Sequence, residues 1–162
     1  MPPLYANSPD QLALDAIRSM SGLESMQAML HGEIPHPPIA ESLNFRLDLV
    51  ERGRVVFRGA PEFGAMNPMG AVHGGWYGAI LDSCLGCAVM STLPKGSVYT
   101  TLEYKVNIIR AIALGAEVLA EARVSHSGRT TGIASGEIRG AQDGKLYATG
   151  STTSMIFAPA AR

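Results

Sequence analysis

The chain has 162 residues, of which 46% are hydrophobic and 17% are charged, and its formal net charge at pH 7 is −1. This length is enough for one domain with a sizeable core, and the small net charge excludes the basic stripe of a nucleic-acid-binding protein. Residues 1–94 hold 5 Lys and Arg against 9 Asp and Glu, whereas residues 95–162 hold 8 against 5, so the halves carry −4 and +3 and the second suits a small polyanionic ligand.

The N-terminal region has the pattern of a helical segment. Residues 8–11, SPDQ, predict a helix start with serine as N-cap, proline in the first turn and glutamine completing a capping box. Hydrophobic residues follow at helical spacing through residues 12–30, and Ser21-Gly22 is expected to break or bend the helix. Its methionines either pack against the core or line an apolar pocket. The first ten residues lack a charged segment before an apolar one, which predicts a cytoplasmic protein without a signal peptide.

Two strands are expected after this helical segment. Residues 36–38, HPP, predict an extended linker. Hydrophobic and polar residues alternate over residues 43–49, which is typical of a half-buried strand, and residues 55–58 return as its hairpin partner. We therefore expect an N-terminal helical extension over residues 1–40 and a main domain over residues 41–162.

The most hydrophobic stretch of the chain predicts a central helix. Residues 74–94 carry a single charge, Asp82, and their apolar residues cover every side of a helical wheel, which indicates a helix buried on all sides. At roughly 19 residues the helix would be about 28 Å long, which would also suit a membrane span. Four glycines and a carboxylate argue against that alternative, because a charge at mid-bilayer is costly. An ionisable group in such a helix is a candidate functional residue.

The two cysteines, Cys84 and Cys87, form a C-x-x-C pair inside this helix. A redox pair needs one exposed thiol at a helix N-terminus, where the pKa of the thiol is lowered. A zinc site needs further Cys or His ligands. We therefore interpret both cysteines as small buried hydrophobic residues.

The rest of the chain has the pattern of β-strands. The predicted strands cover residues 98–108, 118–124, 130–139 and 146–157, with turns at Ser127-Gly128 and Asp143-Gly144. Five to six antiparallel strands and one apolar helix predict an α+β fold in which a curved sheet wraps around the long central helix.

The motif NPMGAVHGG at residues 67–75, with Asp82 nine residues after its histidine, resembles the hotdog-fold acyl-CoA thioesterases. The most similar branch is the PaaI-like (phenylacetyl-CoA) thioesterases, and the resemblance covers roughly residues 43–157, including residues 101–110 and 126–129. It implies a hydrolase that cleaves an aryl- or medium-chain acyl-CoA into free acid and CoA. Coenzyme A would be part of the substrate, with no separate cofactor and no metal. The resemblance also implies a homodimer with shared active sites, paired further into a homotetramer, and neither nucleic acid nor membrane as partner.

The motif supplies the candidate substrate-activating groups. The amides of Gly74 and Gly75 open the helix, and such amides can stabilise the oxyanion that forms when a thioester carbonyl is attacked. The alternative is that both glycines only permit a tight turn. By the resemblance, Asn67 bonds the thioester region and His73 shapes the loop or helps to bind substrate; a loop-packing role for His73 stays open.

The spacing of Asp82 and Gly74 favours a site built from two subunits. Eight residues of helix separate them by about 12 Å, so both cannot touch one thioester. In a dimer with antiparallel helices, Asp82 of one subunit would approach Gly74 of the other. The alternative is a carboxylate capped locally by Ser83, since an unpaired buried carboxylate is costly. Asp82 can act as nucleophile or as general base for water, and the sequence does not separate these roles.

Two further points concern substrate groups. Some relatives carry a hydroxyl one helical turn after the acid, where this chain has Gly86. A different group must therefore help to position the attacking water. The nucleotide end of coenzyme A needs donors, and the best candidates are Ser127, Gly128 and Arg129 on a turn of the basic half. A solvated hairpin tip is the alternative for these three residues.

Two competing functions have different sequence requirements. A hotdog enoyl-CoA hydratase places Asp and His in a D-x-N-P-x-H run, whereas residues 65–66 before Asn67-Pro68 are Ala-Met and His73 comes too late. A non-catalytic acyl-CoA sensor would need an output domain, and residues 1–40 are too poor in charge to form a DNA-binding one.

Overall fold

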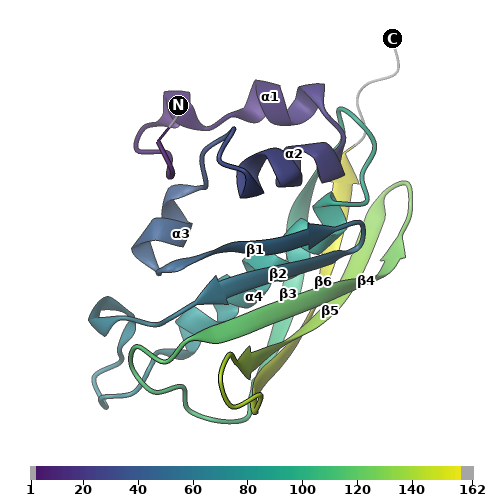
Figure 1. Cartoon of the computed structure of the whole chain (residues 1–162). Coiled ribbons are helices and arrows are strands. Elements are labelled where there is room, and N and C mark those ends of the chain that lie inside the picture. The colour runs from purple at the N-terminus through teal and green to yellow at the C-terminus, as the bar shows by residue number, and fades with distance from the viewer. Residues whose placement is uncertain (1–2, 158–162) are drawn as a thin grey trace.

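The computed structural model describes residues 3–157. Within them, six antiparallel strands form one sheet in the order β1-β2-β4-β5-β6-β3. In chain order the strands are β1 Phe45–Glu51, β2 Arg54–Gly59, β3 Val98–Ile108, β4 Val118–Ser127, β5 Thr131–Gly140 and β6 Leu146–Phe157. The sheet curves around the long helix α4, Gly74–Met90 (Figure 1). This confirms the predicted α+β layout and the hotdog fold that the resemblance implied.

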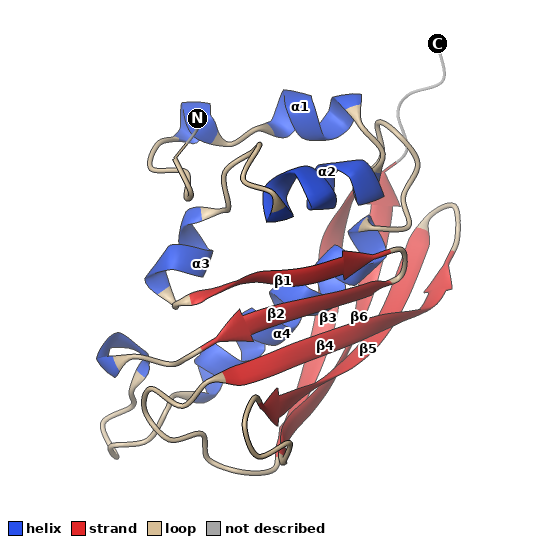
Figure 2. Ribbon diagram, viewed as in Figure 1, coloured by secondary structure: helices blue, strands red, loops and turns tan. Residues whose placement is uncertain are grey.

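Three further α-helices precede the sheet: α1 Leu14–Ser19, α2 Gly22–Leu30 and α3 Pro38–Ser42. They gather on the side of the sheet where β1 lies (Figure 2), and both α2 and α3 contact β1. Two 3-10 helices complete the chain, Pro9–Gln11 before α1 and Phe63–Ala65 before α4. Among the described residues no helix has the length and hydropathy that a bilayer span requires.

The start of the helical segment differs from the prediction. Residues 9–11 form only a 3-10 helix, and the side chain of Ser8 makes no capping bond. The capping box lies instead at Ser21, whose backbone N–H donates to Glu24 (2.7 Å) and whose hydroxyl accepts from the Glu24 N–H (3.3 Å). A new helix can begin there because both groups are satisfied. The predicted break at Ser21-Gly22 is therefore confirmed.

Two local features of the first hairpin also differ. The extended linker ends earlier than expected, because α3 already begins at Pro38. In β1 a bulge between Leu47 and Leu49 shifts the register, so that Val50 rather than Leu49 is buried. A one-residue shift exchanges the two faces of a strand, and simple alternation does not reveal it.

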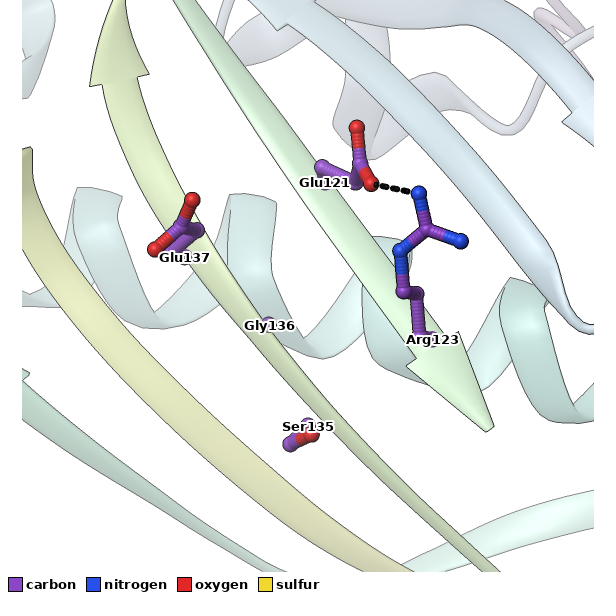
Figure 3. Close-up of a pocket in the computed structure, with 5 residues that line it drawn as sticks. All are labelled: Glu121, Arg123, Ser135, Gly136 and Glu137. Atoms are coloured by element: carbon purple, nitrogen blue, oxygen red, sulfur yellow. Dashed lines mark ion pairs between the residues drawn. The ribbon is translucent and has the colours of Figure 1, made fainter. Parts of the chain in front are cut away.

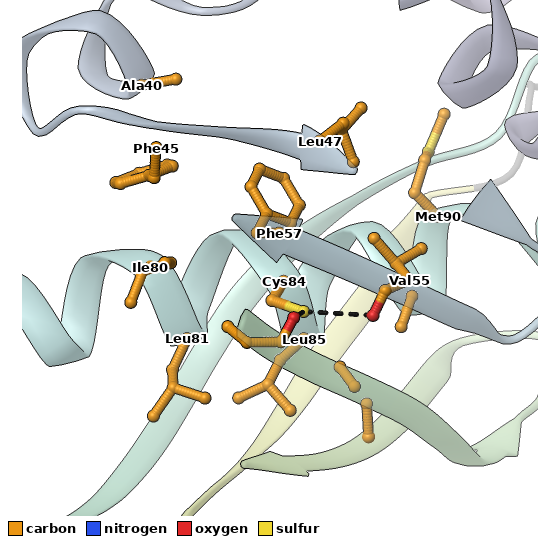
Figure 4. Close-up of a cluster of buried hydrophobic side chains, with 14 of the residues drawn as sticks. Ala40, Phe45, Leu47, Val55, Phe57, Ile80, Leu81, Cys84, Leu85 and Met90 are labelled. Atoms are coloured by element: carbon orange, nitrogen blue, oxygen red, sulfur yellow. Dashed lines mark hydrogen bonds between the residues drawn. The ribbon is translucent and has the colours of Figure 1, made fainter. Parts of the chain in front are cut away.

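The core lies between α4 and the concave face of the sheet (Figure 4). Ile80, Leu81 and Leu85 of α4 are fully buried, and each such side chain stabilises the fold by about 1.5–3 kcal/mol. The thiol of Cys84 donates to the carbonyl of Ala120 at 3.0 Å. Burial raises the pKa of Cys84, so this residue stays a neutral thiol, as its interpretation as a buried hydrophobic residue requires.

Candidate active site

One face of α4 carries almost no side chains and lies against the edge strand β3. This stripe consists of Gly74, Gly78, Asp82 and Gly86, which recur at every fourth residue. Its contacts on β3 are Gly74 with Ile108, Gly78 with Tyr104, Asp82 with Thr101 and Gly86 with Tyr99. Residues four apart share one helix face, and glycine lets another element come close. Asp82 is thus the one functional side chain on the stripe.

The carboxylate of Asp82 is held by the strand opposite it. The hydroxyl of Thr101 donates to Oδ1 of Asp82 at 2.9 Å, and no bond from Ser83 reaches the carboxylate. Asp82 is partly buried and lines a hollow of about 480 Å³ that also contains Tyr99 and Cys87. Burial raises the pKa of the Cys87 thiol to about 12. The hollow therefore places a carboxyl group beside a thiol that stays protonated at neutral pH.

Tyr99 occupies the space that a side chain at Gly86 would fill. A Cβ at position 86 would collide with the Tyr99 hydroxyl, which lies one helical turn from Asp82 in the same hollow. Burial raises the pKa of Tyr99, so its hydroxyl keeps its proton at neutral pH and can donate. The sequence did not identify Tyr99 and Thr101, because a bulge between Thr101 and Glu103 changes which residues of β3 face the helix.

The first turn of α4 offers one free amide rather than two. His73 is the N-cap residue, and its Nδ1 accepts a hydrogen bond from the Gly75 N–H at 2.8 Å. The Gly74 N–H has no acceptor within the described residues. Gly74 is therefore the available donor at the positive end of the helix dipole. The role of Gly75 in substrate binding stays a prediction.

Asn67 organises the loop before the helix. Its Oδ1 accepts from the N–H groups of Met69 (3.0 Å) and Ala71 (3.1 Å). Its Nδ2 makes no hydrogen bond within residues 3–157, so only that group is free to meet a substrate. The predicted bond from Asn67 to a thioester stays a prediction, now restricted to the amide nitrogen.

The two halves of the candidate site lie in separate hollows of one chain. The hollow at the start of α4 has a volume of about 340 Å³ and is lined by His73, Gly75, Trp76, residues 64–66 and Leu43. It shares no residue with the hollow beside Asp82. The helix is continuous between them, so the predicted separation of Gly74 and Asp82 holds.

The predicted nucleotide-binding residues lie on the β4–β5 hairpin. The hydroxyls of Ser127 and Thr92 are 2.7 Å apart, which places the hairpin at the C-terminal end of α4. Gly128 donates its N–H to Thr131 at 2.8 Å and closes the turn that the sequence predicted. Arg129 is exposed and makes no ion pair among the described residues, so its guanidinium is available to an anion.

Another polar hollow, of about 220 Å³, lies on β4 and β5 (Figure 3). The acidic side chains that line it already form ion pairs with arginines. Glu121 pairs with Arg123 at 2.8 Å and with Arg54 at 2.9 Å, and the Arg54 guanidinium lowers the pKa of Glu121. Glu137 in the same hollow pairs with Arg139. No group of three or more His, Cys, Asp or Glu suited to a metal ion occurs in the part of the chain that the structure describes.

Comparison with known proteins gives concordant results. The thioesterase superfamily model matches residues 69–147. Mouse acyl-coenzyme A thioesterase 13 is 28% identical over 90 residues, which are 56% of this chain and 64% of that protein. The crystal structure of a phenylacetic acid degradation-related protein from Ralstonia eutropha is 32% identical with a TM-score of 0.72, covering 80% of this chain and 98% of that one. Smu.793 from Streptococcus mutans, bound to acetyl-CoA, is 26% identical with a TM-score of 0.65, covering 71% and 90%.

Proposed function

The chain belongs to the thioesterase superfamily, and we propose that it hydrolyses the thioester of an aryl- or medium-chain acyl-CoA to the free acid and CoA. The observation that carries this proposal is the carboxylate of Asp82, held by Thr101 on a glycine-lined helix face beside a ligand-sized hollow. A similar structure that is bound to acetyl-CoA supports the choice of ligand.

Asp82 can cleave the thioester by two routes. As a nucleophile, one carboxylate oxygen attacks the carbonyl carbon, the CoA thiolate leaves, and water then hydrolyses the mixed anhydride. As a general base, the carboxylate takes a proton from a water whose oxygen attacks the carbonyl, and it returns that proton to the CoA sulfur as the C–S bond breaks. In both routes the Thr101 hydroxyl donates a hydrogen bond to Oδ1 of Asp82, which leaves Oδ2 of Asp82 to react. The Tyr99 hydroxyl supplies the nearby donor that Gly86 lacks.

The oxyanion that forms on the thioester carbonyl needs a hydrogen-bond donor. We assign this role to the Gly74 N–H, which is free and lies at the start of α4. An amide donor at a helix start meets developing negative charge without reorganising. Because Gly74 is about 12 Å from Asp82 along the same helix, this donor must come from a second subunit.

The exposed edge of β3 is where we place that second subunit. Leu102, Tyr104 and Ile108 of this strand are 54%, 47% and 51% exposed, and an exposed hydrophobic edge strand is a template for pairing. A two-fold axis normal to the sheet would pair β3 with its copy and set the two α4 helices antiparallel. Each Gly74 would then approach the Asp82 of the other chain. The predicted tetramer stays a prediction.

Charges on β3 favour one register of this pairing. Glu103 and Lys105 are exposed and form no ion pair within residues 3–157. A two-fold centred on Tyr104 places each Glu103 opposite the Lys105 of the copy. Centring on Glu103 or on Lys105 would instead place like charges face to face, which is unfavourable.

The test is a panel of acyl-CoA thioesters, including acetyl-, hexanoyl-, decanoyl- and phenylacetyl-CoA, assayed for free thiol with the wild type and Asp82→Asn. Asparagine keeps the shape of the side chain and removes the base or nucleophile, so kcat should fall at least about a hundredfold. Asp82→Asn should keep the melting temperature and CoA affinity of the wild type. If the wild type binds acyl-CoA but releases no thiol, the protein is a non-catalytic acyl-CoA-binding protein. A variant that retains more than a tenth of turnover would contradict the role of Asp82.

A further inference from the structure

The N-terminal helices supply one wall of the hollow beside Asp82. Leu14 and Ile17 of α1 and Met26 of α2 line it together with Tyr99 and Asp82. Its volume of about 480 Å³ lies within the range of small-molecule sites. The extension is therefore in contact with the space where a bound acyl group would extend from its carbonyl.

A second hollow of about 280 Å³ lies on the other side of the same wall. Leu14 and Ile17 line this hollow too, and Leu12, Ala13, Met29, Pro35 and Pro37 complete it. Its lining residues are all apolar. Helix α1 is thus a single layer of side chains between two neighbouring hollows.

Helix α1 is weakly held in this position. It has six residues, none of which is buried, and no side chain caps its start. Leu14 is 48% exposed although it faces an apolar hollow. So short a helix has little stability of its own, and a ligand that covers Leu14 would remove apolar surface from water.

We propose that Leu14 and Ile17 form the end of the acyl-binding pocket and set the length of acyl chain that the enzyme accepts. This inference rests on the proposed function, because the carbonyl of the acyl group is placed at Asp82. The alternative occupant, the pantetheine arm and nucleotide of CoA, fits poorly. The residues that line the hollow include no Lys or Arg, and Asp82 would repel a phosphate.

The experiment measures kcat/KM for acetyl-, hexanoyl-, decanoyl- and palmitoyl-CoA with two opposite substitutions at one position. In the wild type, each methylene that fits should raise kcat/KM about fourfold until the chain reaches the wall. Leu14→Trp should shorten the pocket and lower kcat/KM for decanoyl-CoA at least about tenfold relative to acetyl-CoA. Leu14→Ala should open the wall towards the second hollow and shift the optimum to a longer chain.

Leu12→Trp is the matched control. Leu12 is 50% exposed, like Leu14, but lines only the second hollow. Its substitution should leave the chain-length profile unchanged. If Leu14→Trp lowers kcat/KM equally for acetyl- and decanoyl-CoA, the hollow holds the pantetheine arm and the inference is wrong. A profile that Leu14→Trp does not change would equally overturn it.

Binding of 1-decanol, an uncharged probe that Asp82 does not repel, separates this inference from the proposed function. Decanol binding to the wild type, followed by calorimetry, should be lost in Leu14→Trp and kept in Leu12→Trp. If that result is found while no acyl-CoA is hydrolysed, the proposed function fails and the apolar pocket remains. If acyl-CoA is hydrolysed but decanol binds equally to all three proteins, the pocket assignment fails alone.

Discussion

The two edge strands of the sheet, β1 and β3, are covered differently. Helices α2 and α3 contact β1, whereas the described residues leave Leu102, Tyr104 and Ile108 on β3 largely exposed. The chain thus protects one edge with its own N-terminal extension. The edge that it leaves open runs along the stripe of α4 that carries both Gly74 and Asp82. This difference is the reason for the proposal that a second copy pairs with the open edge.

The largest effect after loss of Asp82 is expected at the amide beside this open edge. Gly74→Pro removes the N–H, and proline is well tolerated at the first residue of a helix. His73 before it has the extended backbone (φ −63°, ψ 137°) that a following proline requires. We expect kcat to fall about a hundredfold.

Gly74→Ala is the control for this substitution, because it adds a Cβ and keeps the N–H. That Cβ would meet only the flexible end of Ile108 at 3.3 Å. Gly74→Ala should therefore keep most of the activity. Equal losses in both variants would show that crowding, rather than the missing donor, lowers the rate, and Gly74 would not be the oxyanion donor.

A charge reversal on the open edge should have the next largest effect. Lys105→Glu replaces two attractive pairs across the proposed interface with two repulsive ones, so the dimer dissociation constant should rise about tenfold. Analytical ultracentrifugation at low salt measures this change. Adding Glu103→Lys should restore the dimer, whereas Lys95→Glu, on an exposed loop, should leave it unchanged. A double variant that dissociates like the single one would exclude the register centred on Tyr104.

The smallest effect is expected at the β4–β5 hairpin, away from the reacting atoms. Arg129→Ala should raise KM for acyl-CoA about threefold to tenfold with little change in kcat. This pattern is expected because a phosphate contact binds the ground state and the transition state equally. The loss should shrink as salt rises, because screening weakens exposed charge contacts. An acyl-pantetheine substrate lacks the nucleotide phosphates and should not respond.

Arg123→Ala is the matched control, since Arg123 is an exposed arginine on β4 of the same hairpin and pairs with Glu121. It should leave both substrates unaffected. If Arg129→Ala raises KM equally for acyl-pantetheine and acyl-CoA, Arg129 supports the fold or binds the thioester end of the substrate.

The sequence predicted the elements well, because hydrophobic period and turn residues are local signals. The helix that begins at Gly74, the strand over residues 98–108 and the turn at Ser127-Gly128 are all present. The bulge that turns Thr101 towards Asp82 was not predictable, since it depends on how β3 pairs with β6. The capture of the Gly75 amide by His73 depends on loop geometry in the same way. Pairing with a distant strand fixed the first detail, and the path of the loop before α4, where the His73 N–H bonds the Ala65 carbonyl, fixed the second.

Mixing two kinds of inactive subunit tests whether each active site takes Asp82 from one chain and Gly74 from another. Asp82→Asn and Gly74→Pro chains are refolded together in equal amounts, and hybrid dimers are verified by native mass spectrometry. Each hybrid has one site with both groups intact, so random pairing should restore about a quarter of wild-type activity. Asp82→Asn mixed with Asp82→Ala should restore none. Hybrid dimers that form but stay as inactive as their parents would contradict the shared site.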